Sequence, residues 1–150
     1  MNDFSTPGTS NAFGYVASAG NYPQPGKRPQ SSISPTIVEF ANGTFFFATG
    51  AAEGSRIITS TVQNLWHVRD QGMDALSAIS EPRLHDQDIP QITTFEYAYN
   101  NETVTYLESL GHNISYVAPG LSIAQGVMEK AGVFRAATDP RRIESGGAVV

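Results

Sequence analysis

A strand that is apolar on both faces, at residues 44–48, places the tightest limit on what this chain can fold into. Its sequence, Thr-Phe-Phe-Phe-Ala, follows a second apolar run at residues 37–40 and the turn Ala41-Asn42-Gly43. An Asn-Gly turn between two such runs is the signal of a two-stranded hairpin. A strand without a polar face is typical of the interior of a covered sheet. The hairpin is therefore expected to lie inside a layered fold.

A helix is expected directly after the hairpin. Ile58, Val62 and Leu65 lie along one side of it with Trp66 beside them, and Gly72 follows as its stop. No internal repeat follows, and helix and strand patterns continue to alternate.

Two more helices are expected, one capped by Asp74 and ended by Pro82, the other capped by Thr103 and closed by Gly111. Strands are expected at residues 92–95, 114–117, 121–128 and 133–137. This alternation predicts a mixed α/β (α+β) fold. A length of 150 residues fits one domain spanning residues 1–150.

Composition excludes several classes of function. The net charge is −5 without a basic block, so nucleic acid is not expected as a partner. The chain has no cysteine, and its histidines His67, His85 and His112 lack metal-ligand spacing, so no metal site is expected. Residues 1–8 show no signal peptide, and no apolar run approaches the roughly 18 residues that span a bilayer. Sequons at Asn42, Asn101 and Asn113 are candidate glycosylation sites and point toward a secretory route.

The turn at residues 50–55 is the most informative local feature. A buried strand that runs through glycine into a helix N-terminus presents unpaired N–H groups, which hold a carboxylate, a phosphate or a developing oxyanion. Lysine does not follow Gly54, so the turn is not a phosphate-binding loop of the Walker A type. A tight strand-to-helix turn with no further role is the structural alternative.

A second polar feature lies in the segment 5–35, which is rich in Ser, Pro and Gly yet carries three aromatic residues. A long ordered loop of this kind is usually functional. Its hydroxyls Ser31 and Ser32, near two cations on a proline-fixed loop, are suited to bind a carboxylate, and Asp3 is suited to bind an ammonium group. Solvated turns are the alternative for both. The run 81–86 is expected to form a buried salt-bridge turn, and no residue is a convincing nucleophile.

Taken together, the motifs resemble the small subunit of the gamma-glutamyltransferases. The resemblance rests on Met1-Asn2-Asp3-Phe4-Ser5 and on the segments 25–36, 50–57, 81–85, 111–112 and 138–141, which match in order and spacing. It covers essentially the whole chain and implies part of a four-layer αββα sandwich of the N-terminal-nucleophile hydrolase class.

The resemblance also implies a reaction. In this family a threonine exposed by autocleavage attacks the gamma-glutamyl amide of glutathione, with its own α-amino group as base. The acyl-enzyme then passes the glutamyl group to water, or to the amine of an amino acid or peptide. No cofactor is implied. A large subunit cut from the same precursor is implied as a partner, as is an extracellular, vacuolar or membrane-associated location.

Residue by residue, Asp3 matches the family aspartate that holds the α-amino group of the glutamyl substrate. Ser31 and Ser32 match the pair that binds its α-carboxylate, and Gly54 matches the second glycine of the oxyanion pair. The first of these glycines is replaced by Glu53. A non-glycine residue at positive φ costs on the order of 1 kcal/mol, and its carboxylate opposes an oxyanion unless it points away.

The nucleophilic threonine has no counterpart in these 150 residues and is expected to lie N-terminal to Met1, so the chain alone is expected to be inactive. A non-catalytic remnant or binding module is the second hypothesis, with Glu53 as a sign of drift. An acylase of the same fold is a third, opposed by Asp3, Ser31 and Ser32, which suit the two charged ends of a glutamyl group.

Overall fold

The computed structural model describes residues 5–148 and contains two β-sheets with three α-helices. The larger sheet has the strand order β1-β2-β6-β7, with all neighbours antiparallel. Its strands are β1 (Thr36–Glu39), β2 (Phe45–Ala51), β6 (Ala124–Lys130) and β7 (Val133–Thr138). The expected hairpin is confirmed, because β1 pairs with β2 and Gly43 takes φ +80 in the connecting turn.

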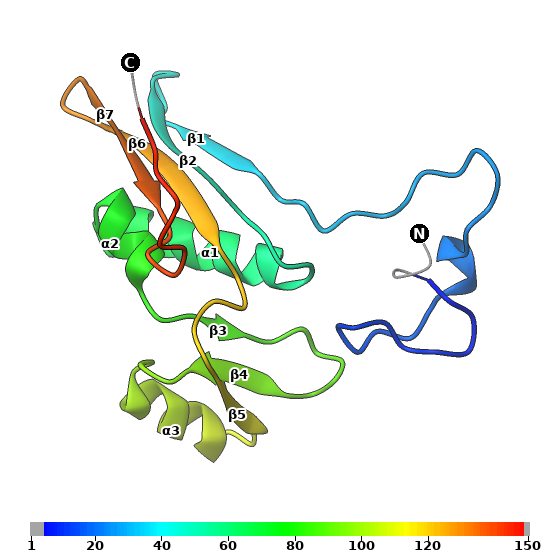
Figure 1. Cartoon of the computed structure of the whole chain (residues 1–150). Coiled ribbons are helices and arrows are strands. Elements are labelled where there is room, and N and C mark those ends of the chain that lie inside the picture. The colour runs from blue at the N-terminus through cyan, green and yellow to red at the C-terminus, as the bar shows by residue number, and fades with distance from the viewer. Residues whose placement is uncertain (1–4, 149–150) are drawn as a thin grey trace.

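Helices α1 (Arg56–Arg69) and α2 (Ala75–Ser80) pack against one face of this sheet (Figure 1). Their contact with the sheet forms the hydrophobic core, whose buried members are Phe47, Val68, Ala75, Ala78, Ile79, Ala124, Met128 and Ala137. On the opposite face Ala48 is half-buried, and the C-terminal tail packs there through Gly147, which lies against Ala136. The apolar second face of β2 is therefore only partly covered within residues 5–148.

The smaller sheet has the order β3-β4-β5, with strands β3 (Leu84–His85), β4 (Thr93–Glu96) and β5 (Ile114–Val117). The pair β3–β4 is antiparallel and the pair β4–β5 is parallel. Helix α3 (Asn101–Ser109) connects the two parallel strands and lies beside them (Figure 1). The strand β3 was not expected from the sequence, because two residues are too few to show an alternating pattern.

The start of α3 corrects one expectation. Thr103 is not the cap: Asn100 occupies that position, and its side chain accepts the Thr103 N–H at 2.9 Å. Asparagine and threonine both cap helices, so the sequence did not decide between Asn100 and Thr103. The cap at Asp74 is confirmed, since its carboxylate accepts the Ser77 N–H at 2.9 Å.

The helix α1 packs with an unexpected face. Ile58, Val62 and Trp66 are 48%, 58% and 46% exposed, whereas the small polar residues Ser60 and Asn64 are almost fully buried. Of the apolar stripe that identified the helix, only part therefore faces the sheet: Leu65 packs against the core, whereas Ile58 and Val62 are exposed. The buried face combines the apolar residues Ile57 and Val68 with polar residues, of which Asn64 bonds to Thr49 at 3.2 Å.

The segment 5–35 forms irregular structure with a single 3-10 turn at Ala19–Asn21. It extends to one side of the sheets and returns toward them (Figure 1). Two long-range hydrogen bonds tie it to the rest of the molecule. Gln87 donates a hydrogen bond to the Phe13 carbonyl, and Ser32 donates one to the Gly54 carbonyl.

Candidate active site

The turn between β2 and α1 holds its backbone carbonyls in a fixed arrangement. The Ala52 carbonyl accepts from Ser122 Oγ at 3.1 Å, and the Glu53 carbonyl accepts from the Arg56 N–H at 3.2 Å. The Gly54 carbonyl accepts from Ser32 Oγ at 2.8 Å and from the Ile57 N–H at 3.1 Å. Every carbonyl of residues 52–54 is therefore occupied by a donor from within the chain.

The N–H groups of the same peptides are not paired. Among residues 5–148, no acceptor receives the N–H of Glu53, Gly54 or Ser55. The Ser55 hydroxyl, which stands at the N-cap of α1, makes no capping bond and donates instead to Gln87 Oε1 at 2.7 Å. Because each peptide is planar and trans, the N–H groups point away from their bonded carbonyls. The turn thus offers a group of unpaired donors at the positive end of a helix.

Two consecutive residues of this turn have left-handed backbone conformations. Glu53 takes φ +82 and Gly54 takes φ +59. A Cβ at Gly54 would lie 2.0 Å from Cζ of Phe13, so the ring of Phe13 lies directly against the glycine backbone. Glycine is thus required here by conformation and by space. Glu53 keeps its side chain in solvent and accepts the strain of positive φ.

The serine pair lies beside this turn. Ser31 is exposed, and its Oγ accepts the Ile33 N–H at 3.1 Å, which leaves the hydroxyl proton available. Ser32 is half-buried and directs its hydroxyl proton to the Gly54 carbonyl. The backbone N–H groups of both serines have no acceptor within the described part of the chain. Three donors of this pair, two N–H groups and the Ser31 hydroxyl, are therefore available to a carboxylate.

Ser31, Ser32 and Gly54 line the same cavity, which has a volume of about 400 Å³. Its remaining wall includes the aromatic rings of Phe13 and Tyr15 and the side chain of Ile58. A volume of this size is within the range of small-molecule sites. The structure thus brings together residues that the sequence separates by more than twenty positions. Asp3 lies outside the described residues.

A second cavity of about 660 Å³ also borders the turn. It is lined by Ala52 and Glu53 from the turn and by Arg142 and Glu144 from the C-terminal tail, among others. Ala52 and Glu53 line this cavity, and Gly54 and Ser55 line the first. The turn with the unpaired N–H groups therefore borders both cavities.

Two residues of the site were not identified from the sequence. Phe13 covers Gly54, and Gln87 joins three segments by bonding to the Phe13 carbonyl, to Ser55 Oγ and to His85 Nε2. Burial lowers the pKa of His85, which favours a neutral ring between Gln87 and Thr59. Aromatic residues in a Ser/Pro/Gly-rich segment were a signal for Phe13, but nothing in the local sequence marks Gln87.

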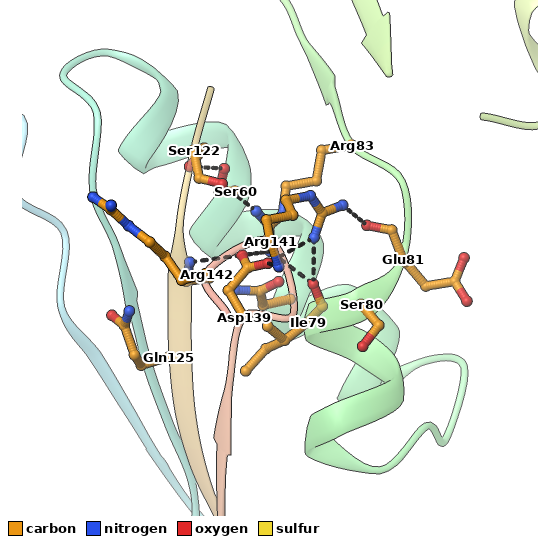
Figure 2. Close-up of polar contacts among 12 residues, drawn as sticks. Ser60, Ile79, Ser80, Glu81, Arg83, Ser122, Gln125, Asp139, Arg141 and Arg142 are labelled. Atoms are coloured by element: carbon orange, nitrogen blue, oxygen red, sulfur yellow. Dashed lines mark hydrogen bonds and ion pairs between the residues drawn. The ribbon is translucent and has the colours of Figure 1, made fainter. Parts of the chain in front are cut away.

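A buried ion cluster centres on Arg83, Asp139 and Arg141 (Figure 2). Arg83 pairs with Asp139 at 2.8 Å, and Arg141 pairs with Asp139 at 3.0 Å and with Glu96 at 2.5 Å. Burial acts to raise the pKa of Asp139, but the N–H groups of Ala124 and Arg141 and the charge of Arg83 outweigh it, so that pKa lies below its usual value. The expected buried salt bridge at Arg83 is confirmed, with a partner from the C-terminal end of the chain.

The remaining titratable groups do not form a metal site. No group of three or more His, Asp and Glu side chains suitable for a metal ion occurs within residues 5–148. His67 is buried against the Ala78 carbonyl at 3.3 Å, and His112 is exposed and contacts Thr93 Oγ1 at 3.1 Å. In the same part of the chain, no helix has the length and apolar character to cross a membrane.

The sequence matches the family model of the gamma-glutamyltranspeptidases over residues 1–149. It is 44% identical over 150 residues to the glutathione hydrolase proenzyme of Arthroderma benhamiae, covering 100% of this chain and 26% of that protein. The glutathione hydrolase of Aspergillus flavus is 42% identical over 151 residues, covering 99% of this chain and 26% of that protein. The chain thus spans about a quarter of the length of these two relatives.

Solved structures have the same fold. The gamma-glutamyltranspeptidase from Pseudomonas nitroreducens complexed with L-DON matches with a TM-score of 0.85 and 32% identity, covering 100% of this chain and 79% of that chain. The T380A mutant of Helicobacter pylori gamma-glutamyltranspeptidase matches with a TM-score of 0.84 and 35% identity, covering 95% of this chain and 78% of that chain. The expected mixed α/β fold of the N-terminal-nucleophile hydrolase class is confirmed.

Proposed function

Because the chain belongs to the gamma-glutamyltranspeptidase family, we propose that it forms the substrate-binding part of a site that transfers or hydrolyses gamma-glutamyl groups. The substrates are glutathione and other gamma-glutamyl compounds. The acceptor is water or the amine of an amino acid or peptide. The family membership supports this reaction class, and the geometry of residues 31–32 and 52–55 supports their roles in it.

The observation that carries the proposal is the cavity that the serine pair shares with Gly54 and Ser55, two residues of the turn whose N–H groups are unpaired within residues 5–148. Attack on a gamma-glutamyl amide or ester creates a tetrahedral oxyanion. The N–H groups of Glu53 and Gly54 are suited to donate to it, because they are already oriented and need no reorganisation during the reaction. Loss of one donor in such a site typically slows turnover by roughly 10² to 10³.

The serine pair is proposed to bind the α-carboxylate of the glutamyl group. The donors are the two backbone N–H groups and the Ser31 hydroxyl, since the Ser32 hydroxyl is bonded to the Gly54 carbonyl. Ser32 therefore acts in two ways. It is an N–H donor, and it links the carboxylate site at residues 31–32 to the turn at residues 52–55, called the oxyanion turn below. Asp3 is proposed to bind the α-ammonium group, completing recognition of both charged ends.

The nucleophile is proposed to be a threonine outside residues 5–148. No described hydroxyl at the turn is paired with a base: Ser55 donates to the amide oxygen of Gln87, which does not take up a proton at neutral pH. A large subunit is proposed as the partner that completes the α-carboxylate site with an arginine. The segment 5–35 is proposed to be the substrate-binding loop of a single domain that covers residues 1–150. Without these partners the isolated chain should not release amine from a gamma-glutamyl anilide.

A chimaeric enzyme tests the proposal directly. The matching segment of the Arthroderma benhamiae proenzyme is replaced by this chain, and release of 4-nitroaniline from gamma-glutamyl-4-nitroanilide is measured. The chimaera should turn over. Ser31→Ala should raise KM by about tenfold or more with kcat little changed, because a hydrogen bond to a charged group contributes about 1.5–3 kcal/mol.

Ser80→Ala serves as the matched control, because Ser80 is an exposed serine whose hydroxyl bonds only within α2. It should leave both constants unchanged. The second candidate function, a binding module derived from the family, is favoured by the charged side chain at the left-handed position 53. A folded, correctly cleaved chimaera without turnover would support that alternative and contradict the catalytic proposal.

A secretory location is proposed from the three sequons. Asn42, Asn101 and Asn113 are all exposed, so each is accessible to a glycosyltransferase. Expression of the chain behind a secretion signal in a fungal host should give a protein whose mass falls on treatment with an endoglycosidase. Loss of that mass difference in the triple Asn→Gln variant identifies the sites. An unmodified wild-type protein contradicts the proposed route.

A further inference from the structure

We propose that Ser122 is a positioning residue that aims the Glu53 N–H at the oxyanion. The proposal rests on the proposed function of the turn at residues 52–55 and extends it to a residue that lines neither cavity. Ser122 precedes β6 and is 70 positions from Ala52 in the sequence. It is 5% exposed and therefore acts through another group rather than by touching substrate.

The contact with Ala52 fixes the direction of the Glu53 N–H. Ser122 Oγ donates to the Ala52 carbonyl at 3.1 Å, and the Ile123 carbonyl accepts the Ala52 N–H at 2.8 Å. The Ala52 carbonyl and the Glu53 N–H belong to one planar trans peptide and point in opposite directions. A hydrogen bond that fixes the carbonyl therefore fixes the N–H on the other side of the peptide.

The Ser122 hydroxyl is itself oriented by a neighbour. It accepts a hydrogen bond from Ser60 Oγ at 2.7 Å, and Ser60 is only 2% exposed. Since a hydroxyl has a single proton, the accepted bond leaves that proton for the Ala52 carbonyl. Exclusion of water removes the competing acceptors that would let the hydroxyl rotate.

The ion cluster anchors the segment that carries Ser122 (Figure 2). Arg83 Nη1 donates to the Ser122 carbonyl at 2.7 Å, and the Ala124 N–H donates to Asp139 Oδ2 at 2.9 Å. Residues 122–124 are thus bonded to buried charges on one side and to Ala52 on the other. The carbonyls of the other two peptides of the turn, those of Glu53 and Gly54, are held by Arg56 and Ser32. Ser122 therefore controls the remaining donor, the Glu53 N–H.

The kinetic test uses Ser122→Ala in the chimaera. Turnover of gamma-glutamyl-4-nitroanilide should fall by about tenfold or more with KM changed by less than about twofold, because misaligned donors affect the transition state and not substrate binding. Ser60→Ala should have a smaller effect, about threefold, since the Ser122 hydroxyl then keeps its bond to Ala52 but loses its orientation. The double variant should be no slower than Ser122→Ala alone, because Ser60 acts only through Ser122.

Thr61→Val is the matched control. Thr61 is a buried hydroxyl on the same helix whose Oγ1 has no partner within the described residues, so its loss should change neither constant. An unchanged kcat in Ser122→Ala overturns the proposal. So does a fall in kcat that Thr61→Val reproduces, because the effect would then be general loss of packing.

Hydrogen exchange supplies a readout that does not depend on activity. The Ala52 N–H bonds to the Ile123 carbonyl, so its exchange reports local opening between the turn and the segment that carries Ser122. In Ser122→Ala, exchange of the Ala52 amide should accelerate by about tenfold, with the change confined to the residues around the turn. Unchanged exchange at this peptide, or a uniform increase over the whole chain, overturns the positioning role even if the wild-type chimaera is inactive. An inactive wild type with locally accelerated exchange contradicts the proposed function and leaves the contact between Ser122 and the turn established.

Discussion

Replacing Glu53 with glycine changes both the backbone strain and the charge of the oxyanion turn. Glu53 takes φ +82, a conformation that costs an L-residue roughly 1–2 kcal/mol and glycine nothing. Glycine also makes the unfolded chain more flexible, which destabilises the protein by about 0.4–1 kcal/mol. The difference predicts that Glu53→Gly stabilises the fold by about 0.5–1 kcal/mol. The unfolding midpoint of a unit of this size should rise by roughly 1–4 °C.

Under the proposed function, we expect the charge of Glu53 to affect turnover separately from the strain. The side chain is exposed, so water screens it. An oxyanion lies about 3 Å beyond its donors. For a separation of about 6 Å between the oxyanion and the Glu53 carboxylate, the two charges repel by about 0.7 kcal/mol in water. Removal of the carboxylate should therefore raise kcat by about threefold. The assay is gamma-glutamyl-4-nitroanilide turnover by the chimaera at low ionic strength, where screening by salt is least.

Glu53→Gln separates the two effects, because it removes the charge and keeps the Cβ. It should raise kcat as glycine does and leave the unfolding midpoint unchanged. Equal midpoints for the glycine and glutamine variants would refute the reasoning about strain. A kcat that is the same in all three proteins would show that the carboxylate points away from the reacting carbonyl.

Two further variants test the packing that supports the site. Asp139→Asn leaves two buried arginines without their shared carboxylate and should destabilise the fold by about 3–5 kcal/mol in a denaturant titration at pH 7. The pKa of Asp139 is lowered in the folded protein. Its contribution to stability is therefore complete above its unfolded pKa near 4 and is lost as the pH falls through the lower folded value. On acidification below about pH 4, the variant should accordingly lose less stability than the wild type. Gly126→Ala should cost about 1–3 kcal/mol by the same measurement, since its Cβ would lie 2.8 Å from Phe47 and 3.1 Å from Ile79; a neutral result would mean that both side chains can move.

Local signals in the sequence determined the elements of the fold. The Asn-Gly turn predicted the hairpin of β1 and β2, and Asp74 correctly marked the start of α2. These features depend on residues within about four positions of one another, which is the range over which a turn or a cap acts. The same range explains the error at α3, where Asn100 and Thr103 compete for one cap.

The face of α1 that packs on the sheet could not be determined in this way. A helical stripe at Ile58, Val62 and Leu65 shows that a helix is amphipathic, but not that Leu65 would pack against the core while Ile58 and Val62 stay exposed. Within this chain, the polar residue Asn64 faces the sheet, where its amide group donates a hydrogen bond to Thr49 of β2. Such partners are set by the topology and leave no periodic signal.

For the site, the sequence alone determined the chemical types: a turn of unpaired donors, a serine pair suited to a carboxylate, and a glutamate in place of glycine at position 53. Only the tertiary structure decided that Ser32 bonds to Gly54 and that Phe13 covers that glycine. It also decided that Ser122 holds the Ala52 carbonyl, and with it the Ala52–Glu53 peptide. The physical reason is that backbone N–H groups exist at every residue. Which of them remain unpaired and where they point depends on hydrogen bonds between segments far apart in the chain.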